Sequence, residues 1–151
     1  MLNRPHHYQN DYRAALRRKI EALSGQVFKR QDLSNDHSNR EQLRLNRALN
    51  AFIEEGFIIK ISHGLYAKAE VITLAKGKKK PVLRESFETI AMEALNKLGV
   101  QWELGSAIQE YNRGVTTQIP VAFTVQLKSR FRGTISAGNR KVLFEGGVNG
   151  R

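Results

Sequence analysis

The sequence contains no cysteine, so disulfide bonds and thiolate chemistry are absent and a reducing cytosol is the expected location. It contains no run approaching about 18 apolar residues, which excludes a membrane-spanning helix. The N-terminal segment lacks the apolar stretch of a secretory signal. We therefore expect a cytoplasmic protein without a membrane partner.

The motifs of common catalytic and cofactor sites are missing as well. There is no phosphate-binding glycine loop, no H-E-x-x-H zinc motif and no G-x-S-x-G nucleophile elbow. The 14 acidic residues are scattered along the chain instead of clustered as a metal-dependent nuclease would need. We therefore expect no enzymatic activity, no cofactor and no metal.

What the chain does have is positive charge. Its 151 residues include 25 Lys and Arg against 14 Asp and Glu, a net charge of +11. Residues 1–80 hold 16 of these basic residues and 8 of the acidic ones, so most of the excess lies in the first half. Such an excess favours a polyanionic partner, with nucleic acid the first candidate.

The first half has the pattern of a DNA-binding fold. Apolar residues at helical spacing from Tyr12 to Leu23 predict a first helix, and 29–33 allow a short second one. Ser38 is a suitable N-cap for a third helix that Gly56 ends, and two short apolar runs around Ser62-His63-Gly64 predict a hairpin. This order predicts a winged helix-turn-helix.

The third helix divides into an apolar and a basic face. Leu45 and Leu49 point to the core, so the opposite face carries arginines, amides and one leucine, a composition that suits the major groove. The residues predicted to contact DNA, including three on or beside the wing, are Arg40, Leu43, Arg44, Asn46, Arg47, Asn50, Lys60, His63 and Lys68. Further contacts to the phosphate backbone are predicted for Arg30, Lys76, Lys78, Lys79 and Lys80. For the last four, a solvated linker is an equal alternative.

The domain organisation follows from one low-complexity run. We predict a winged helix over residues 1–75, an exposed basic linker over 76–81, and a small α+β module over 82–151 that serves dimerisation or partner binding. In that module we expect a strong helix over 83–98, a short helix after Ser106, and strands at 121–127, 130–135 and 141–144. The fold class is therefore α+β.

Several segments together resemble a known family. The chain resembles AbiEi-like antitoxins of type IV (abortive-infection) toxin–antitoxin systems, a likeness that extends over roughly residues 13 to 145. In the winged helix the matching segments are Leu45-Asn46-Arg47-Ala48-Leu49, Gly56-Phe57-Ile58-Ile59-Lys60-Ile61 and His63-Gly64-Leu65-Tyr66-Ala67-Lys68. Downstream they are residues 91–100, Tyr111-Asn112-Arg113-Gly114, Thr116-Thr117-Gln118-Ile119-Pro120 and Gly138-Asn139-Arg140-Lys141-Val142.

This resemblance implies a repressor that binds the double-stranded DNA of its own promoter and opposes a partner toxin. The helix around Asn46-Arg47 and the wing around His63-Gly64 would be its DNA elements. A homodimer is a further expectation, because an isolated winged helix reads few base pairs. Two alternatives stay open: an RNA-binding protein, and a protein-interaction module that uses a winged helix only as a scaffold.

Overall fold

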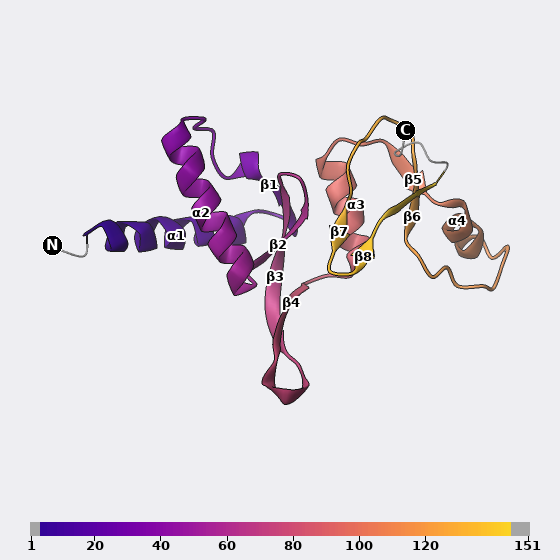
Figure 1. Cartoon of the computed structure of the whole chain (residues 1–151). Helices are drawn as coiled ribbons and strands as arrows, with labels where there is room; N and C mark the ends of the chain where they lie inside the picture. Colours follow the sequence, from indigo (N-terminus) through magenta and orange to yellow (C-terminus); the bar gives the residue numbers. More distant parts are fainter. Residues whose placement is uncertain (1–3, 146–151) are drawn as a thin grey trace.

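The computed structural model describes residues 4–145, with side chains from residue 10 onward, and within that range it is a mixed α+β fold (Figure 1). The described range holds four α-helices and three small sheets. Residues 1–3 and 146–151, the outer ends of the two predicted domains, lie outside it. No helix between residues 4 and 145 has the length and apolar character needed to cross a bilayer.

Two long helices build one side of the first half. They are α1 (Arg4–Ala22) and α2 (Asn39–Glu55). The hydroxyl of Ser38 accepts a hydrogen bond from the backbone N–H of Glu41, and Gly56 ends α2 with a φ of 81°, as the sequence predicts. The second helix predicted over 29–33 is wrong in extent. That segment forms β1 (Val27–Lys29) and a single 3₁₀ turn, η1 (Arg30–Asp32), because Val27 and Phe28 pair with another strand.

The strands of the first half form one antiparallel sheet. β2 (Ile58–Ser62) and β3 (Leu65–Thr73) are joined by the predicted tight turn, in which Gly64 takes a φ of 68°. The β1 strand pairs with the other edge of β3, so the order is β1-β3-β2. Helix–strand–turn–helix–hairpin is therefore the observed order of elements.

The prediction of a linker over residues 76–81 is wrong. Beyond Ala69, β3 continues as one arm of a second hairpin, and its partner is β4 (Lys79–Leu83). A 3₁₀ turn, η2 (Ala75–Gly77), joins the arms, with left-handed φ values of 66° at Lys76 and 76° at Gly77. The lysine-rich composition indicated exposure, which is observed, but concealed a strand that pairs with residues 69–73.

The second half has more strands than predicted. Its elements are α3 (Phe87–Lys97), β5 (Trp102–Leu104), α4 (Ser106–Asn112), β6 (Thr124–Leu127), β7 (Ser136–Ala137), β8 (Arg140–Lys141) and β9 (Leu143–Glu145). Both predicted helices are present, but the first begins at Phe87, because Leu83 belongs to β4. The strand predicted over 130–135 is wrong, because Ile135 is buried as a single anchor while the residues before it form a loop.

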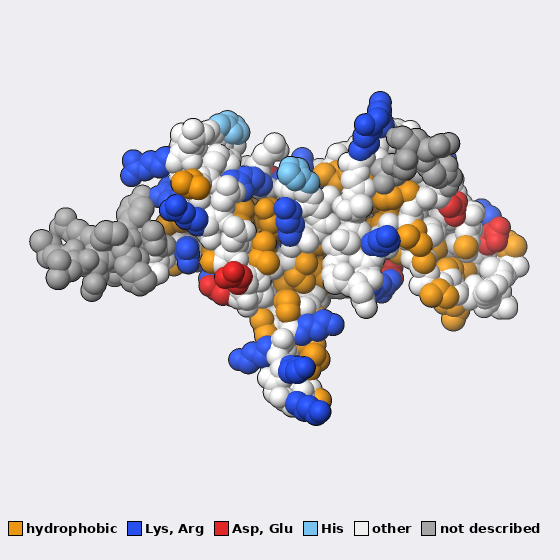
Figure 2. Space-filling model, in the orientation of Figure 1, with side chains coloured by type: hydrophobic (Ala, Val, Ile, Leu, Met, Phe, Trp, Pro, Cys, Tyr) orange, Lys and Arg blue, Asp and Glu red, His pale blue; other side chains and the backbone are white. Residues whose placement is uncertain are grey.

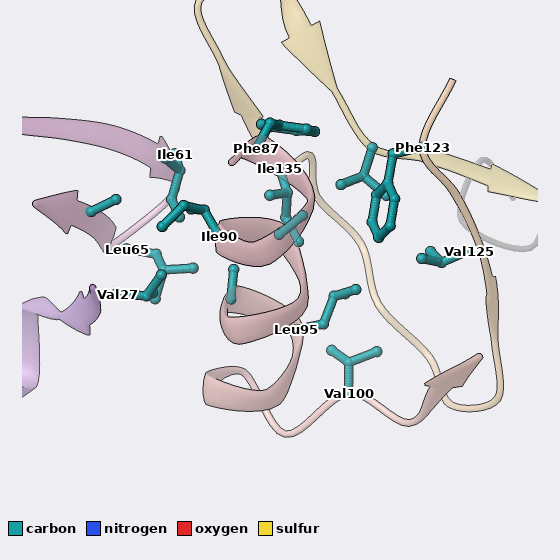
Figure 3. Packing of buried hydrophobic residues seen from close by; sticks show 14 residues of the cluster. Val27, Ile61, Leu65, Phe87, Ile90, Leu95, Val100, Phe123, Val125 and Ile135 are labelled. Carbon is teal, nitrogen blue, oxygen red and sulfur yellow. The ribbon is translucent and has the colours of Figure 1, made fainter. Parts of the chain in front are cut away.

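The two halves share the first sheet. On one face, Phe28, Ile58 and Tyr66 pack with α1 and α2; on the other, Val27, Ile61 and Leu65 pack with α3. Figure 3 shows Val27, Ile61 and Leu65 on one side of this helix, with Phe123 and Val125 on its far side. The run Leu65–Ala69 is buried throughout because β3 is covered on both faces.

A carboxylate also joins the halves. Glu93 of α3 accepts hydrogen bonds from the backbone N–H groups of Gln26, at 2.9 Å, and Val27, at 2.8 Å. A Cβ atom at Gly25 would collide with this carboxylate, and the φ of 74° at this position also favours glycine. The start of β1 is thereby fixed to α3.

Candidate nucleic-acid interface

The α2 helix separates its residues into the two predicted faces. Leu45, Ala48, Leu49 and Phe52 are buried between α1 and the sheet. The opposite face exposes the predicted DNA-contact residues Arg40, Leu43, Asn46, Arg47 and Asn50. Leu43 is 51% exposed, which leaves an apolar group on an otherwise polar surface.

Arg44 differs from its neighbours on α2. Its guanidinium pairs with the carboxylate of Glu41 at 2.7 Å and lies over the Tyr12 ring, 4.0 Å from the centroid. Burial and the Glu41 carboxylate raise the pKa of Tyr12 above its ordinary value. Arg44 is therefore held half-buried against α1, with much of its charge neutralised by Glu41.

The turn between β2 and β3 meets the middle of α2. A groove of about 410 Å³ lies between them, lined by Arg30, Gln42, Asn46, Lys60, His63, Gly64 and Tyr66. Lys60 and His63 are exposed, as predicted for wing residues. The groove unites candidate residues from η1, α2 and both sides of the hairpin turn.

Arg30 holds two of the elements that line this groove together. Its guanidinium donates to the side-chain oxygen of Gln42 at 2.7 and 3.0 Å and to the Gln42 carbonyl at 3.1 Å. These bonds hold η1 against the first turns of α2. The sequence predicted Arg30 as a phosphate contact; the structure gives it a defined role in fixing the helix, with the guanidinium still at the edge of the groove.

Lys68 is the clear error among the predicted contacts. It is 5% exposed, and its ammonium donates to the carbonyl oxygens of Leu23 at 2.6 Å and Glu21 at 3.4 Å, at the end of α1. The prediction placed Lys68 on or beside an exposed wing, and so took the face of the strand that carries it to be open to solvent. Here α1 covers that face of β3, so Lys68 cannot reach a phosphate.

A neighbouring groove crosses into the second half. Lys60, Ile61, Ser62 and His63 line it from one side, and Thr134 and Ser136 line it from the other, around a volume of about 280 Å³. The sequence gave no signal for Thr134 and Ser136, because only the packing of β7 beside β2 brings them here. The hydroxyl groups thus extend the polar surface beyond the β2–β3 turn.

Basic residues lie in separate groups on this side of the molecule. Figure 2 shows Lys and Arg side chains along α2, near the β2–β3 turn and over the β3–β4 hairpin on the same face. Lys76, Lys78, Lys79 and Lys80 are all exposed at that hairpin. Among the described residues no three His, Asp or Glu side chains group as a metal site would require.

Comparisons with known proteins identify no relative. No family model matches the chain, no curated protein is significantly similar in sequence, and no solved structure is significantly similar to it.

Proposed function

We propose that this protein is a sequence-specific repressor that binds double-stranded DNA through a winged helix-turn-helix. The observation that carries this proposal is the groove between α2 and the β2–β3 turn. It brings Asn46, Lys60 and His63 beside the exposed, polar side of one helix. The order of elements and the β1-β3-β2 sheet support it, with η1 in place of the usual second helix.

The chemistry of the exposed face suits the major groove. Arg47 can bond guanine in bidentate fashion, Asn46 or Asn50 can bond adenine, and Leu43 can contact a thymine methyl group. Arg40 lies in the first turn of α2, where phosphate contacts would fix the register of the helix on the duplex. Lys60 and His63 would contact the backbone or minor groove beside it.

Aromatic exposure favours DNA over RNA. Recognition of single-stranded RNA uses exposed rings on which bases stack. Between residues 10 and 145 the aromatic side chains are buried or half-buried, apart from Tyr111, which is 40% exposed and lies far along the chain in α4. RNA binding therefore has less support than duplex binding.

The wider biological role follows the family resemblance. In an AbiEi-like system the duplex would be the promoter of the protein's own operon, and a toxin would be encoded beside it. A homodimer would double the number of base pairs read. Purification of the protein together with the product of the adjacent gene tests the toxin partner, and light scattering on operator DNA tests the dimer.

A fluorescence-anisotropy titration tests DNA recognition directly. The probes are the duplex upstream of the gene and a shuffled duplex of the same composition, each at two salt concentrations. Specific regulators prefer their site by roughly 10³-fold or more. Arg47→Ala should cost about 1–3 kcal/mol on the preferred site and little on the shuffled one. Arg113→Ala, an exposed arginine after α4, is the matched control.

Two results would contradict the proposal. One is equal binding of both duplexes with the same steep salt dependence, which indicates electrostatic attraction alone. The other is an unchanged base preference in Arg47→Ala, which removes α2 as the reading element. Preferential binding of a structured RNA over both duplexes would favour the RNA alternative instead.

A further inference from the structure

The hairpin of β3 and β4 stands away from the body of the protein. Within the main sheet, β3 pairs with β1 and β2 as far as Lys68. Beyond Ala69 its strand partner is β4, through the pairs Val71↔Pro81 and Thr73↔Lys79. Figure 1 shows this two-stranded ribbon projecting past the end of α2, with η2 at its tip. A ribbon of two strands has little stability of its own, because it buries few side chains.

The tip carries uncompensated positive charge. Lys76, Lys78, Lys79 and Lys80 are exposed, and none forms an ion pair with any residue between 10 and 145. No acidic residue occurs between Glu70 and Glu85. Four like charges within five residues repel one another. The repulsion among these lysines therefore destabilises the ribbon, and an anionic partner would offset that repulsion.

The root of the ribbon is fixed to α2. A Cβ atom at Gly56, the C-cap of α2, would lie 2.5 Å from the Cγ2 of Val71 and 3.4 Å from the Cβ of Pro81. These two residues pair with each other across the ribbon, so their side chains share the face that rests on the helix end. The ribbon thus leaves the body at a set position relative to the reading helix.

The other face of the ribbon is apolar and basic. Ile72 pairs with Lys80, and the backbone of Leu74 bonds to Lys78, so these four side chains alternate on one surface. Ile72 is 38% exposed and Leu74 is 43% exposed. Lysines beside exposed aliphatic groups suit the sugar–phosphate backbone and the floor of a narrow groove better than they suit an acidic protein surface.

We propose that the β3–β4 hairpin is a DNA-binding arm that follows the phosphate backbone of the same duplex that α2 contacts. This inference rests on the proposed function and adds a second, sequence-independent contact to it. From Glu70 to Lys76 the ribbon reaches about 20 Å at the rise of a β-strand. Along a duplex of about 35 Å per turn, this places the tip roughly six base pairs beyond the site of α2.

The first test replaces all four lysines with glutamine: Lys76→Gln, Lys78→Gln, Lys79→Gln and Lys80→Gln. Each phosphate contact contributes about 0.9 to the slope of log affinity against log salt. With all four lost, the fall in affinity between 50 and 200 mM salt should shrink by about 10²-fold. The preference for the specific duplex should stay unchanged, because phosphate contacts carry no sequence information.

A matched variant removes the same charge elsewhere. Arg18→Gln, Arg113→Gln, Arg130→Gln and Lys141→Gln are four exposed positions outside the hairpin and outside α2. If this variant changes the salt slope as much as the hairpin variant does, net charge explains the effect and the arm is excluded. Equal melting temperatures of both variants and the native protein confirm that the hairpin changes leave the fold intact.

A second test locates the tip on DNA. Because the chain has no cysteine, Ala75→Cys introduces a single attachment point for an iron chelate that cleaves nearby backbone. Cleavage confined to positions about six base pairs outside the region that α2 protects is expected. The proposal that the hairpin binds DNA would be contradicted by cleavage scattered along the duplex. It would also be contradicted by no more cleavage than the chelate produces at Arg113→Cys.

The outcomes separate the two proposals. If the native protein prefers its site and the lysine variant behaves as the native protein does, only the arm fails. If the native protein shows no preference, the proposed function fails first. Co-sedimentation with phosphatidylserine vesicles that is lost in the lysine variant, with unchanged DNA binding, would assign the hairpin to a membrane surface and overturn the DNA arm.

Discussion

The ammonium of Lys68 donates a 2.6 Å hydrogen bond to the carbonyl oxygen of Leu23 across the face of β3 that α1 covers. A second carbonyl, that of Glu21, lies at 3.4 Å. The last carbonyls of a helix carry a partial negative charge and have no partner within the helix, so a buried cation there is favourable. Lys68, which the sequence predicted as a wing contact, thus holds the end of α1 against β3 instead.

Lys68→Met should therefore lower the stability of the fold. The change keeps the aliphatic stem and removes the hydrogen bonds, so we expect a loss of about 1.5–3 kcal/mol in urea unfolding. Lys60→Met, at an exposed position on the neighbouring strand, should change stability by less than about 0.5 kcal/mol. Equal effects of the two substitutions would contradict the role assigned to Lys68.

Glu93 should contribute as much to the stability of the fold as a buried core residue does. Glu93→Ala leaves the N–H groups of Gln26 and Val27 without an acceptor, at about 1–3 kcal/mol for each group that stays unpaired. Glu93→Gln keeps one acceptor oxygen and should lose less than Glu93→Ala does. Thermal unfolding of both variants, with the exposed Glu110→Ala as control, checks this order.

Local sequence signals predicted the helices best. These signals are the cap at Ser38, the stop at Gly56 and the apolar spacing of α2 and α3. Each acts within a few residues, so it can be recognised without knowledge of the tertiary structure. The burial of Lys68, the strand over 79–83 and the role of Thr134 depend on segments far away in the sequence. The sequence placed Lys68 on or beside an exposed wing, whereas α1 and α3 cover β3 on both sides. It therefore found α2 and the turn of the site but misplaced one wing contact.

Glu41 should weaken DNA binding in the native protein. Its carboxylate neutralises Arg44 on the side of α2 proposed to meet the duplex. Glu41→Gln removes this charge while the Ser38 cap keeps its backbone partner, so we expect a several-fold gain in affinity for specific and shuffled duplexes alike. Anisotropy at low salt measures the gain. Glu110→Gln, on α4, is the control and should leave the affinity for DNA unchanged. A loss of affinity in Glu41→Gln would contradict the prediction and show that Arg44 contributes to DNA binding only while Glu41 holds it in place.

Acid should weaken one contact between α1 and the hairpin. Arg84 donates to both carboxylate oxygens of Glu21 at 3.0 Å, and this bonding holds the pKa of Glu21 below its ordinary value. A lowered pKa in the folded state means that the stabilisation is present above the unfolded pKa and is lost as the pH falls through the folded one. Since both side chains are partly exposed, it amounts to less than about 1 kcal/mol.

Urea unfolding across pH checks this linkage. Glu21→Gln should be less stable than the native protein at neutral pH, and the two should converge as the solution becomes acidic. Glu110→Gln, an exposed change on α4, is the control. A constant difference between Glu21→Gln and the native protein at all pH values would contradict the assigned cause.

The shared strand has a consequence for how the chain comes apart. Since β3 supplies Leu65 and Ala67 to one core and Tyr66 to the other, neither core survives the loss of that strand. A fragment of residues 1–75 would leave Val27, Ile61 and Leu65 in water and lack the carboxylate that holds the start of β1. We therefore expect unfolding to be a single cooperative event in which α2 and the second half lose their structure together.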